Sequence, residues 1–190
     1  MLINCKATCT LVFLFAVHLP AGLLAQVLDI TTAPDSVDIA IDQLETVGKA
    51  TLRVFFWDVY DSELLTQDGD YHGVEPGLAL NLTYKRALTN QQLVAGTQKE
   101  WGKLSGPEFL VKQNWSTQLL GLWPNVEVND EILLYVDSQL ASHFYFNGNK
   151  LGVLTDSAFT EQFLAIWLSP ETSYPKARAK LLNLSINNPP

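Results

Sequence analysis

The longest regular pattern in the chain is a run of β-branched and aromatic residues around position 55. Residues 51–59 contain no glycine or proline, and their side chains favour a strand. Because strand side chains alternate between faces, Arg53 and Trp57 share one face, and Leu52 and Tyr60 share the other. Both faces are mostly apolar. We therefore expect a central strand that is covered on both sides.

An arginine on such a face needs a partner, because a buried unpaired charge is very costly. One interpretation is that Arg53 binds the carboxylate of a ligand in an apolar pocket. The alternative is an internal ion pair, or a guanidinium that reaches water past an apolar stem. Tyr60 points to the opposite face, so it does not share a site with Arg53 unless a β-bulge intervenes.

The rest of the chain divides into further strands and four helices. Alternation of apolar and polar residues predicts short strands within 27–46 and longer ones over 78–86 and 131–137. Glycines and Pro76 indicate a loop over 61–77. Asn147-Gly148 suits a type I′ turn, with a bulged turn as the alternative, and predicts a hairpin of 141–146 with 150–154.

Helix starts are marked by capping residues. Thr89 and Gln92 form a capping box, and Gly106-Pro107 ends that helix and begins a second one that runs to about Leu120. Asp156 caps a helix through Trp167, and a last helix starts at Ser173 and Pro175 and ends at Leu182. This order of strands, two helices, strands and two helices predicts an α+β fold with an antiparallel sheet.

Residues 1–25 have the features of a signal peptide. Lys6 precedes an apolar run of 16 residues, which is short for a membrane-spanning helix, and Ala25 suits a cleavage site. The alternative is an uncleaved membrane anchor. We expect a periplasmic or secreted protein with one domain over 26–186, a flexible tail over 187–190 and no membrane span once the signal is removed. Both cysteines, Cys5 and Cys9, lie in the signal, so the mature chain has no disulfide or thiolate site.

The net charge and the absence of common catalytic and nucleotide-binding motifs argue against several classes of function. The net charge of −8 disfavours nucleic acid and anionic membrane surfaces as partners. His72 and His143 lie far apart and lack the spacing of a metal site, so we expect no metal or other cofactor. The chain contains no GxSxG, GxGxxG or P-loop motif.

Several stretches resemble the bacterial chalcone isomerase-like proteins. The resemblance rests on Gly48-Lys49, the run 57–61, Leu78-Ala79-Leu80 and Leu88-Thr89 in the first half, and covers roughly 48–182. Its more specific part comprises Phe146-Asn147-Gly148, Gly152, Asp156, Phe159, Phe163, the run 166–169, Pro175, Arg178 and Leu181-Leu182. The resemblance implies an antiparallel sheet covered on one face by a layer of helices, the open-faced β-sandwich of that family.

The resemblance also argues against flavonoid isomerisation. In the plant isomerases the corresponding helix carries a catalytic tyrosine and, seven residues later, an asparagine; Leu93 and Glu100 take these places here. Seven residues are two helical turns, so both positions face the same way. Leucine cannot donate a hydrogen bond to a developing oxyanion, and a carboxylate would repel one. The strand threonine is replaced by Phe55 or Phe56, and no arginine precedes Gly48-Lys49.

Related members of the wider family bind fatty acids through an arginine and a tyrosine. By that resemblance, Arg53 with Tyr60 or Tyr84 would hold a carboxylate, and Trp57, Leu93 and Glu100 would complete a ligand site. We therefore expect an exported, non-catalytic binding protein for a small amphipathic carboxylate such as a fatty acid. The alternatives are a protein-interaction module without a ligand site, and an isomerase or lyase that uses Arg53 and Glu100. For Tyr60 and Tyr84 a role as amphipathic core residues is the competing interpretation.

Overall fold

The computed structural model describes residues 41–184, apart from Phe55 and residues 107–113. These residues all belong to the compact unit 34–190. Within them, no helix is long and apolar enough to cross a membrane. The predicted signal peptide and its cleavage site, the predicted strands within 27–40 and the tail 187–190 lie outside the described residues.

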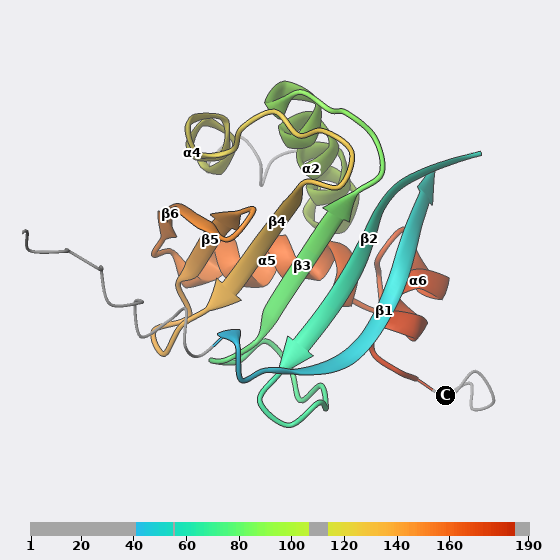
Figure 1. Cartoon of the computed structure of the whole chain (residues 1–190), viewed down its shortest axis with the longest axis vertical. Helices are drawn as coiled ribbons and strands as arrows, with labels where there is room; N and C mark the ends of the chain where they lie inside the picture. Colours follow the sequence, from blue (N-terminus) through green and yellow to red (C-terminus); the bar gives the residue numbers. More distant parts are fainter. Residues whose placement is uncertain (1–40, 55, 107–113, 185–190) are drawn as a thin grey trace, which may run out of the picture. The chain divides into compact units, whose positions relative to one another are not determined.

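Six strands form one antiparallel sheet in which each strand pairs with its neighbour in sequence. Figure 1 shows this meander running from β1 at one edge to β6 at the other. The strands are β1 (Glu45–Val54), β2 (Trp57–Thr66), β3 (Ala79–Tyr84), β4 (Glu131–Val136), β5 (Ser142–Phe146) and β6 (Asn149–Leu154). The predicted turn at Asn147-Gly148 joins β5 to β6, and both of its residues have positive φ values of 48° and 77°, as a type I′ turn requires.

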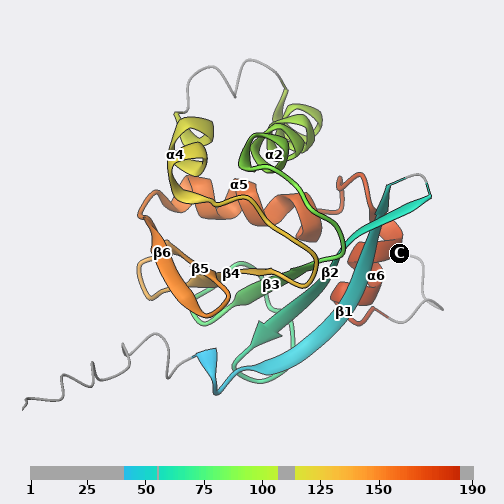
Figure 2. The ribbon, with the colours of Figure 1, turned by 45° about the horizontal axis from the view of Figure 1, so that its top comes forward.

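The described helices lie on one face of this sheet (Figure 2). They are α2 (Asn90–Ser105), α4 (Trp115–Leu122), α5 (Ser157–Leu168) and α6 (Pro175–Leu181). The predicted capping box is present at the start of α2, where Thr89 and Gln92 bond each other's backbone, and Asp156 caps α5. The prediction of an α+β fold with a helix layer on one face of an antiparallel sheet is confirmed.

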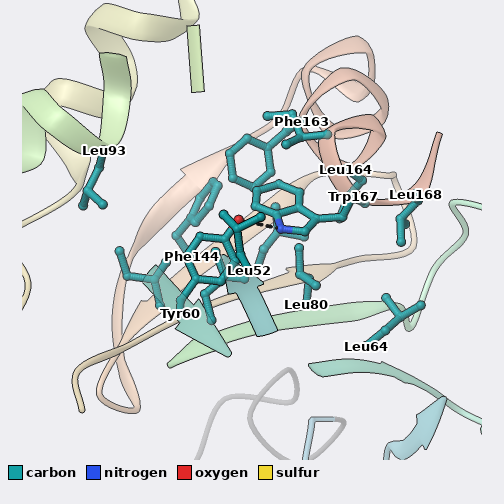
Figure 3. Close-up of a cluster of buried hydrophobic side chains, with 14 of the residues drawn as sticks. Leu52, Tyr60, Leu64, Leu80, Leu93, Phe144, Phe163, Leu164, Trp167 and Leu168 are labelled. Atoms are coloured by element: carbon teal, nitrogen blue, oxygen red, sulfur yellow. Dashed lines mark hydrogen bonds between the residues drawn. The ribbon is translucent and has the colours of Figure 1, made fainter. Parts of the chain in front are cut away.

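A row of large apolar side chains crosses the helix-covered face and forms the centre of the core. Leu64, Leu80, Leu134 and Phe144 are successive cross-strand partners, and each is at most 1% exposed. Helix α5 lays the aromatic stripe Phe159, Phe163 and Trp167 over the sheet at helical spacing. Figure 3 shows Phe163 and Trp167 packed above Leu80 and Phe144. A buried leucine or phenylalanine contributes about 1.5–3 kcal/mol, so each residue of this row contributes substantially to stability.

The other face of β1 and β2 is polar. Cross-strand ion pairs join Lys49 to Glu63 at 2.9 Å and Arg53 to Asp58 at 2.6 Å, and Lys85 of the segment after β3 reaches Asp61 at 2.8 Å. These side chains are substantially exposed, so each pair contributes little to stability. Along β1 and β2 these polar side chains alternate with buried apolar ones. The apolar face of the hairpin is therefore the one that the helices cover.

The prediction of a single central strand over 51–59 is wrong. The chain turns back between Val54 and Trp57, so β1 and β2 form a hairpin, with β1 at the edge of the sheet. No glycine, proline or asparagine marks this turn, and an apolar run with a turn inside it looks like one buried strand. Arg53 consequently lies near the hairpin tip, where its side chain is 66% exposed and paired with Asp58.

Three other boundaries differ from the sequence prediction. The predicted loop over 61–77 is wrong for its first six residues, because β2 continues to Thr66. The predicted helix over 107–120 is described only from Trp115, and the described helix runs on to Leu122. The strand expected to end near Thr46 is instead the start of β1.

Gly48 offers a direct test of how β1 meets the helix layer. A Cβ at this position would lie 2.7 Å from the carbonyl oxygen of Leu181 and still closer to that of Lys180, both backbone atoms of α6. Gly48→Ala should therefore destabilise the protein by about 1–3 kcal/mol, as overpacking does. In Gly121→Ala the new methyl meets nothing within 4 Å, so this helical control should gain up to about 1 kcal/mol. Urea unfolding measures both, and equal stability of Gly48→Ala and wild type would contradict the packing described here.

A cavity between the sheet and helix α2

A partly open cavity of about 280 Å³ lies between α2 and the ends of the first three strands. Its volume is near the lower end of the range for ligand pockets. Three groups of residues form its walls. The sheet contributes Leu52, Val54, Val59, Tyr60, Leu82 and Tyr84; α2 and the residue before its cap contribute Leu88, Gln92, Leu93, Gly96, Thr97, Lys99 and Glu100; and the far wall is formed by Trp123, Ile166, Trp167 and Tyr174.

Two tyrosines form part of the cavity floor. Tyr60 and Tyr84 are cross-strand partners on the helix-covered face, with ring centroids 5.8 Å apart in an edge-to-face arrangement. The indole N–H of Trp167 donates a hydrogen bond of 2.9 Å to the Tyr60 hydroxyl oxygen, drawn as a dashed line in Figure 3. This bond uses the oxygen as an acceptor and leaves the hydroxyl proton of Tyr60 available for a ligand.

Burial keeps both tyrosines neutral. Loss of hydration raises the pKa of Tyr60 well above its usual value, and the neighbouring Tyr84 raises it further. Loss of hydration likewise raises the pKa of Tyr84. At neutral pH the two phenols therefore keep their protons and cannot act as bases that abstract a proton from a substrate.

Helix α2 presents two parallel rows of side chains to the cavity. Leu93, Thr97 and Glu100 are buried and face inward at spacings of four and three residues. Gln92, Gly96 and Lys99 repeat the same spacing one position earlier and are exposed, so they form the rim. The prediction that positions 93 and 100 face the same way is confirmed.

Glu100 is an internal ion-pair residue at one end of the cavity. Its Oε1 accepts hydrogen bonds from Lys103 Nζ at 2.8 Å and from the Tyr174 hydroxyl at 3.1 Å. Burial acts to raise the pKa of the Glu100 carboxyl, but bonds from Lys103, Ser173 and Tyr174 outweigh it and lower that pKa. Burial, with the nearby Glu100 charge, raises the pKa of Tyr174 to about 12. Glu100 is therefore an ionised carboxylate held by protein partners.

Lys99 is the cation at the mouth of the cavity. It lines the rim, and it makes no ion pair with any residue that the structure describes. Lys103, one turn further along α2, by contrast forms an ion pair with Glu100. An ammonium group without a carboxylate partner beside an apolar cavity can attract the anionic end of an amphipathic molecule.

The structure brings four of the six predicted site residues together. Tyr60, Tyr84, Leu93 and Glu100 line the cavity, whereas Arg53 and Trp57 do not. Arg53 forms an ion pair with Asp58, but this pair lies exposed at the hairpin tip and is not internal. Arg53 and Glu100 are not brought together around the cavity, so the pairing that an isomerase or lyase would use is absent from the described structure.

The sequence prediction missed several cavity residues. Once the helix is accepted, spacings of three and four residues from Leu93 and Glu100 identify Gly96 and Thr97, so this signal was present in the sequence. Nothing in the sequence indicated Trp167 or Tyr174, because they arrive from the far end of the chain through tertiary packing. Among the residues described, no cluster of three or more His, Cys, Asp or Glu side chains is placed to hold a metal ion.

The ion pair of Glu100 makes stability depend on pH. Because its pKa is lower in the folded state than the usual value of 4.5, the unfolded chain binds more protons in acid. The stabilisation is therefore present above about pH 4.5 and is lost as pH falls through the lowered pKa. Glu100→Gln should cost about 1.5–3 kcal/mol at pH 7, and its difference from wild type should shrink in acid.

The control is Glu161→Gln, which removes an exposed carboxylate of α5 that has no ion pair among the described residues. It should change stability by no more than about 0.5 kcal/mol at either pH. Urea unfolding at pH 7 and in acid measures both variants. A cost for Glu100→Gln that stays constant with pH would contradict the ionised state described here.

Comparison with known proteins relates the chain to a protein of similar sequence and to solved structures of similar fold. No family model matches the chain. An uncharacterised protein of Haemophilus influenzae is 25% identical over 144 residues, which cover 76% of this chain and 70% of that protein. A fatty-acid binding protein of Arabidopsis thaliana superposes with a TM-score of 0.56 at 14% sequence identity, covering 75% of this chain and 88% of that one. The chain therefore has the chalcone isomerase-like fold.

Proposed function

We propose that this protein is an exported, non-catalytic binding protein of the bacterial chalcone isomerase-like family, and that its ligand is a small amphipathic carboxylate such as a medium-chain fatty acid. The observation that carries the proposal is the apolar cavity with Lys99 at its mouth, a lysine that has no ion pair with the described part of the chain. The fatty-acid binding by the Arabidopsis structural neighbour supports the same class of ligand.

The size of the cavity favours a medium-length tail. At about 30 Å³ for each water of the liquid, 280 Å³ corresponds to roughly nine water volumes. A methylene group is of similar size, so the cavity accommodates a tail of roughly eight to ten carbons, while the carboxylate stays at the rim. Octanoate and decanoate fit this description, and the longer tail of palmitate would extend into water.

Apolar burial supplies most of the binding free energy. Each buried methylene contributes about 0.8 kcal/mol, so seven contribute roughly 6 kcal/mol. An exposed ion pair between Lys99 and a carboxylate adds only about 0–1 kcal/mol. The tail therefore determines affinity, and Lys99 determines which end of the ligand stays at the rim.

The polar groups inside the cavity argue for binding over catalysis. Tyr60 and Tyr84 are neutral hydrogen-bond donors. The Glu100 carboxylate already accepts hydrogen bonds from Lys103 and Tyr174. The positions that correspond to the catalytic tyrosine and asparagine of the plant isomerases are Leu93 and Glu100, and both line the cavity. Neither can stabilise an oxyanion by donating a hydrogen bond.

Two helical glycines provide a matched test of the cavity. A Cβ added at Gly96 or at Gly121 meets nothing within 4 Å, but only Gly96 lines the cavity. Gly96→Leu should fill the mouth and weaken binding of decanoate by about tenfold or more, since tenfold corresponds to 1.4 kcal/mol. Gly121→Leu should bind as wild type does. Calorimetric titration with decanoate measures both variants, and equal binding by Gly96→Leu would place the ligand elsewhere.

Lys99 tests the orientation of the ligand. Lys99→Met should weaken binding of decanoate by up to about fivefold and leave binding of decanol unchanged, because only the acid carries a charge. Lys176→Met removes an exposed lysine of α6 away from the cavity and should change neither affinity. Arg53→Ala should likewise leave binding intact. A large loss with Arg53→Ala and none with Lys99→Met would overturn the proposed orientation.

A further inference from the structure

The tip of the β1–β2 hairpin exposes two large aromatic side chains. Phe56 is 94% exposed and Trp57 is 67% exposed, whereas the other tryptophans, Trp101, Trp115, Trp123 and Trp167, are at most 9% exposed. Figures 1 and 2 show this end of the hairpin projecting beyond the neighbouring strand β3. Leaving such side chains in water forgoes about 1.5–3 kcal/mol of burial each, so an interaction partner for the tip is expected.

We propose that this aromatic tip, formed by Phe56 and Trp57, docks the protein on a phospholipid surface and places the mouth of the cavity against the bilayer. The inference rests on the proposed function, because it names the source from which an amphipathic ligand would enter or to which it would leave. The tip is outside the set of residues that line the cavity.

The tip is continuous with the cavity mouth. Val54 and Val59 flank the turn in sequence, and both line the cavity. Val54 is itself 37% exposed, so apolar surface runs from the aromatic tip into the cavity. A ligand tail that leaves a membrane at the tip would therefore cross apolar side chains and little open water.

The small area of the tip favours a lipid surface over a protein partner. A phenylalanine or tryptophan buries about 150–250 Å² when fully covered, so the two side chains together offer roughly 300 Å² at their observed exposure. A specific protein interface needs about 800 Å² from each partner. Single aromatic residues, in contrast, settle at the headgroup level of a bilayer without needing a complementary surface.

The charges beside the tip fit lipid phosphates. The Arg86 guanidinium lies 5.9 Å from the centre of the Trp57 ring and has no ion-pair partner among the described residues. Arg53, on the other strand of the hairpin, is paired with Asp58 but keeps most of its surface exposed. A guanidinium binds phosphate well, whereas the net charge of −8 opposes a strongly anionic surface. A zwitterionic phosphatidylcholine surface therefore fits better than an anionic one.

Trp57 itself reports on docking. Of the five tryptophans, all of which the structure describes, Trp57 alone is exposed. Quenching of tryptophan fluorescence by brominated phosphatidylcholine vesicles therefore measures insertion of the tip. Residues 1–25 contain no tryptophan, so the assay works whether or not the signal is cleaved. We expect quenching of wild type and weaker quenching of Phe56→Ser, which keeps the probe. In vesicle flotation, Phe56→Ser/Trp57→Ser should lose association on the order of tenfold.

Val153→Ser is the control for flotation, since it removes an exposed apolar side chain from β6 at the opposite edge of the sheet. It should float as wild type does. Circular dichroism checks that each variant is folded. Absence of Trp57 quenching, equal flotation of the double variant and wild type, or association of wild type through the tip without lipid in analytical ultracentrifugation would each overturn the proposal.

Binding of decanoate in solution separates this inference from the proposed function. The double variant should bind decanoate with wild-type affinity, because the tip lies outside the cavity lining. Vesicle docking without decanoate binding would leave the membrane inference standing and remove the proposed ligand. Decanoate binding without Trp57 quenching would retain the ligand and reject membrane docking.

Discussion

The aromatic stripe of α5 on the sheet is the interaction on which the rest of the structure depends. Phe159 and Phe163 close the core over the row that includes Phe144, and Trp167 continues the stripe toward β2. There the indole N–H binds the Tyr60 hydroxyl oxygen. This hydrogen bond ties a residue of the cavity floor directly to the aromatic stripe of the core.

The cavity follows from how the helices cover the sheet. Helix α5 packs against β5, and α6 packs against β1 and β2. Helix α2 contacts α5 and α4, and its row of Leu93, Thr97 and Glu100 faces the cavity. Between α2 and the paired tyrosines of β2 and β3, the side chains do not fill the available space. The space that remains is lined mostly by apolar side chains, with two neutral tyrosines on its floor and the ion-paired carboxylate of Glu100 at one end.

Much of the fold could be predicted from the sequence, because local signals agreed with the tertiary structure. The capping box at Thr89, the Asn147-Gly148 turn and the Asp156 cap each act through nearby backbone atoms. The β1–β2 hairpin could not be predicted, because its turn carries no local signal and its register is set by cross-strand partners. The same error placed Arg53 on a covered face. The family resemblance singled out Leu93 and Glu100, which both line the cavity, but Trp167 and Tyr174 reach the cavity only through long-range packing.

The central claim is that the cavity holds a small amphipathic carboxylate. The most direct measurement is native mass spectrometry of the protein purified from its own host, followed by extraction and identification of the bound molecule. The account predicts one carboxylate of medium chain length for each protein molecule. A clean apo mass, with no uptake from a mixture of fatty acids and other small acids, would contradict it.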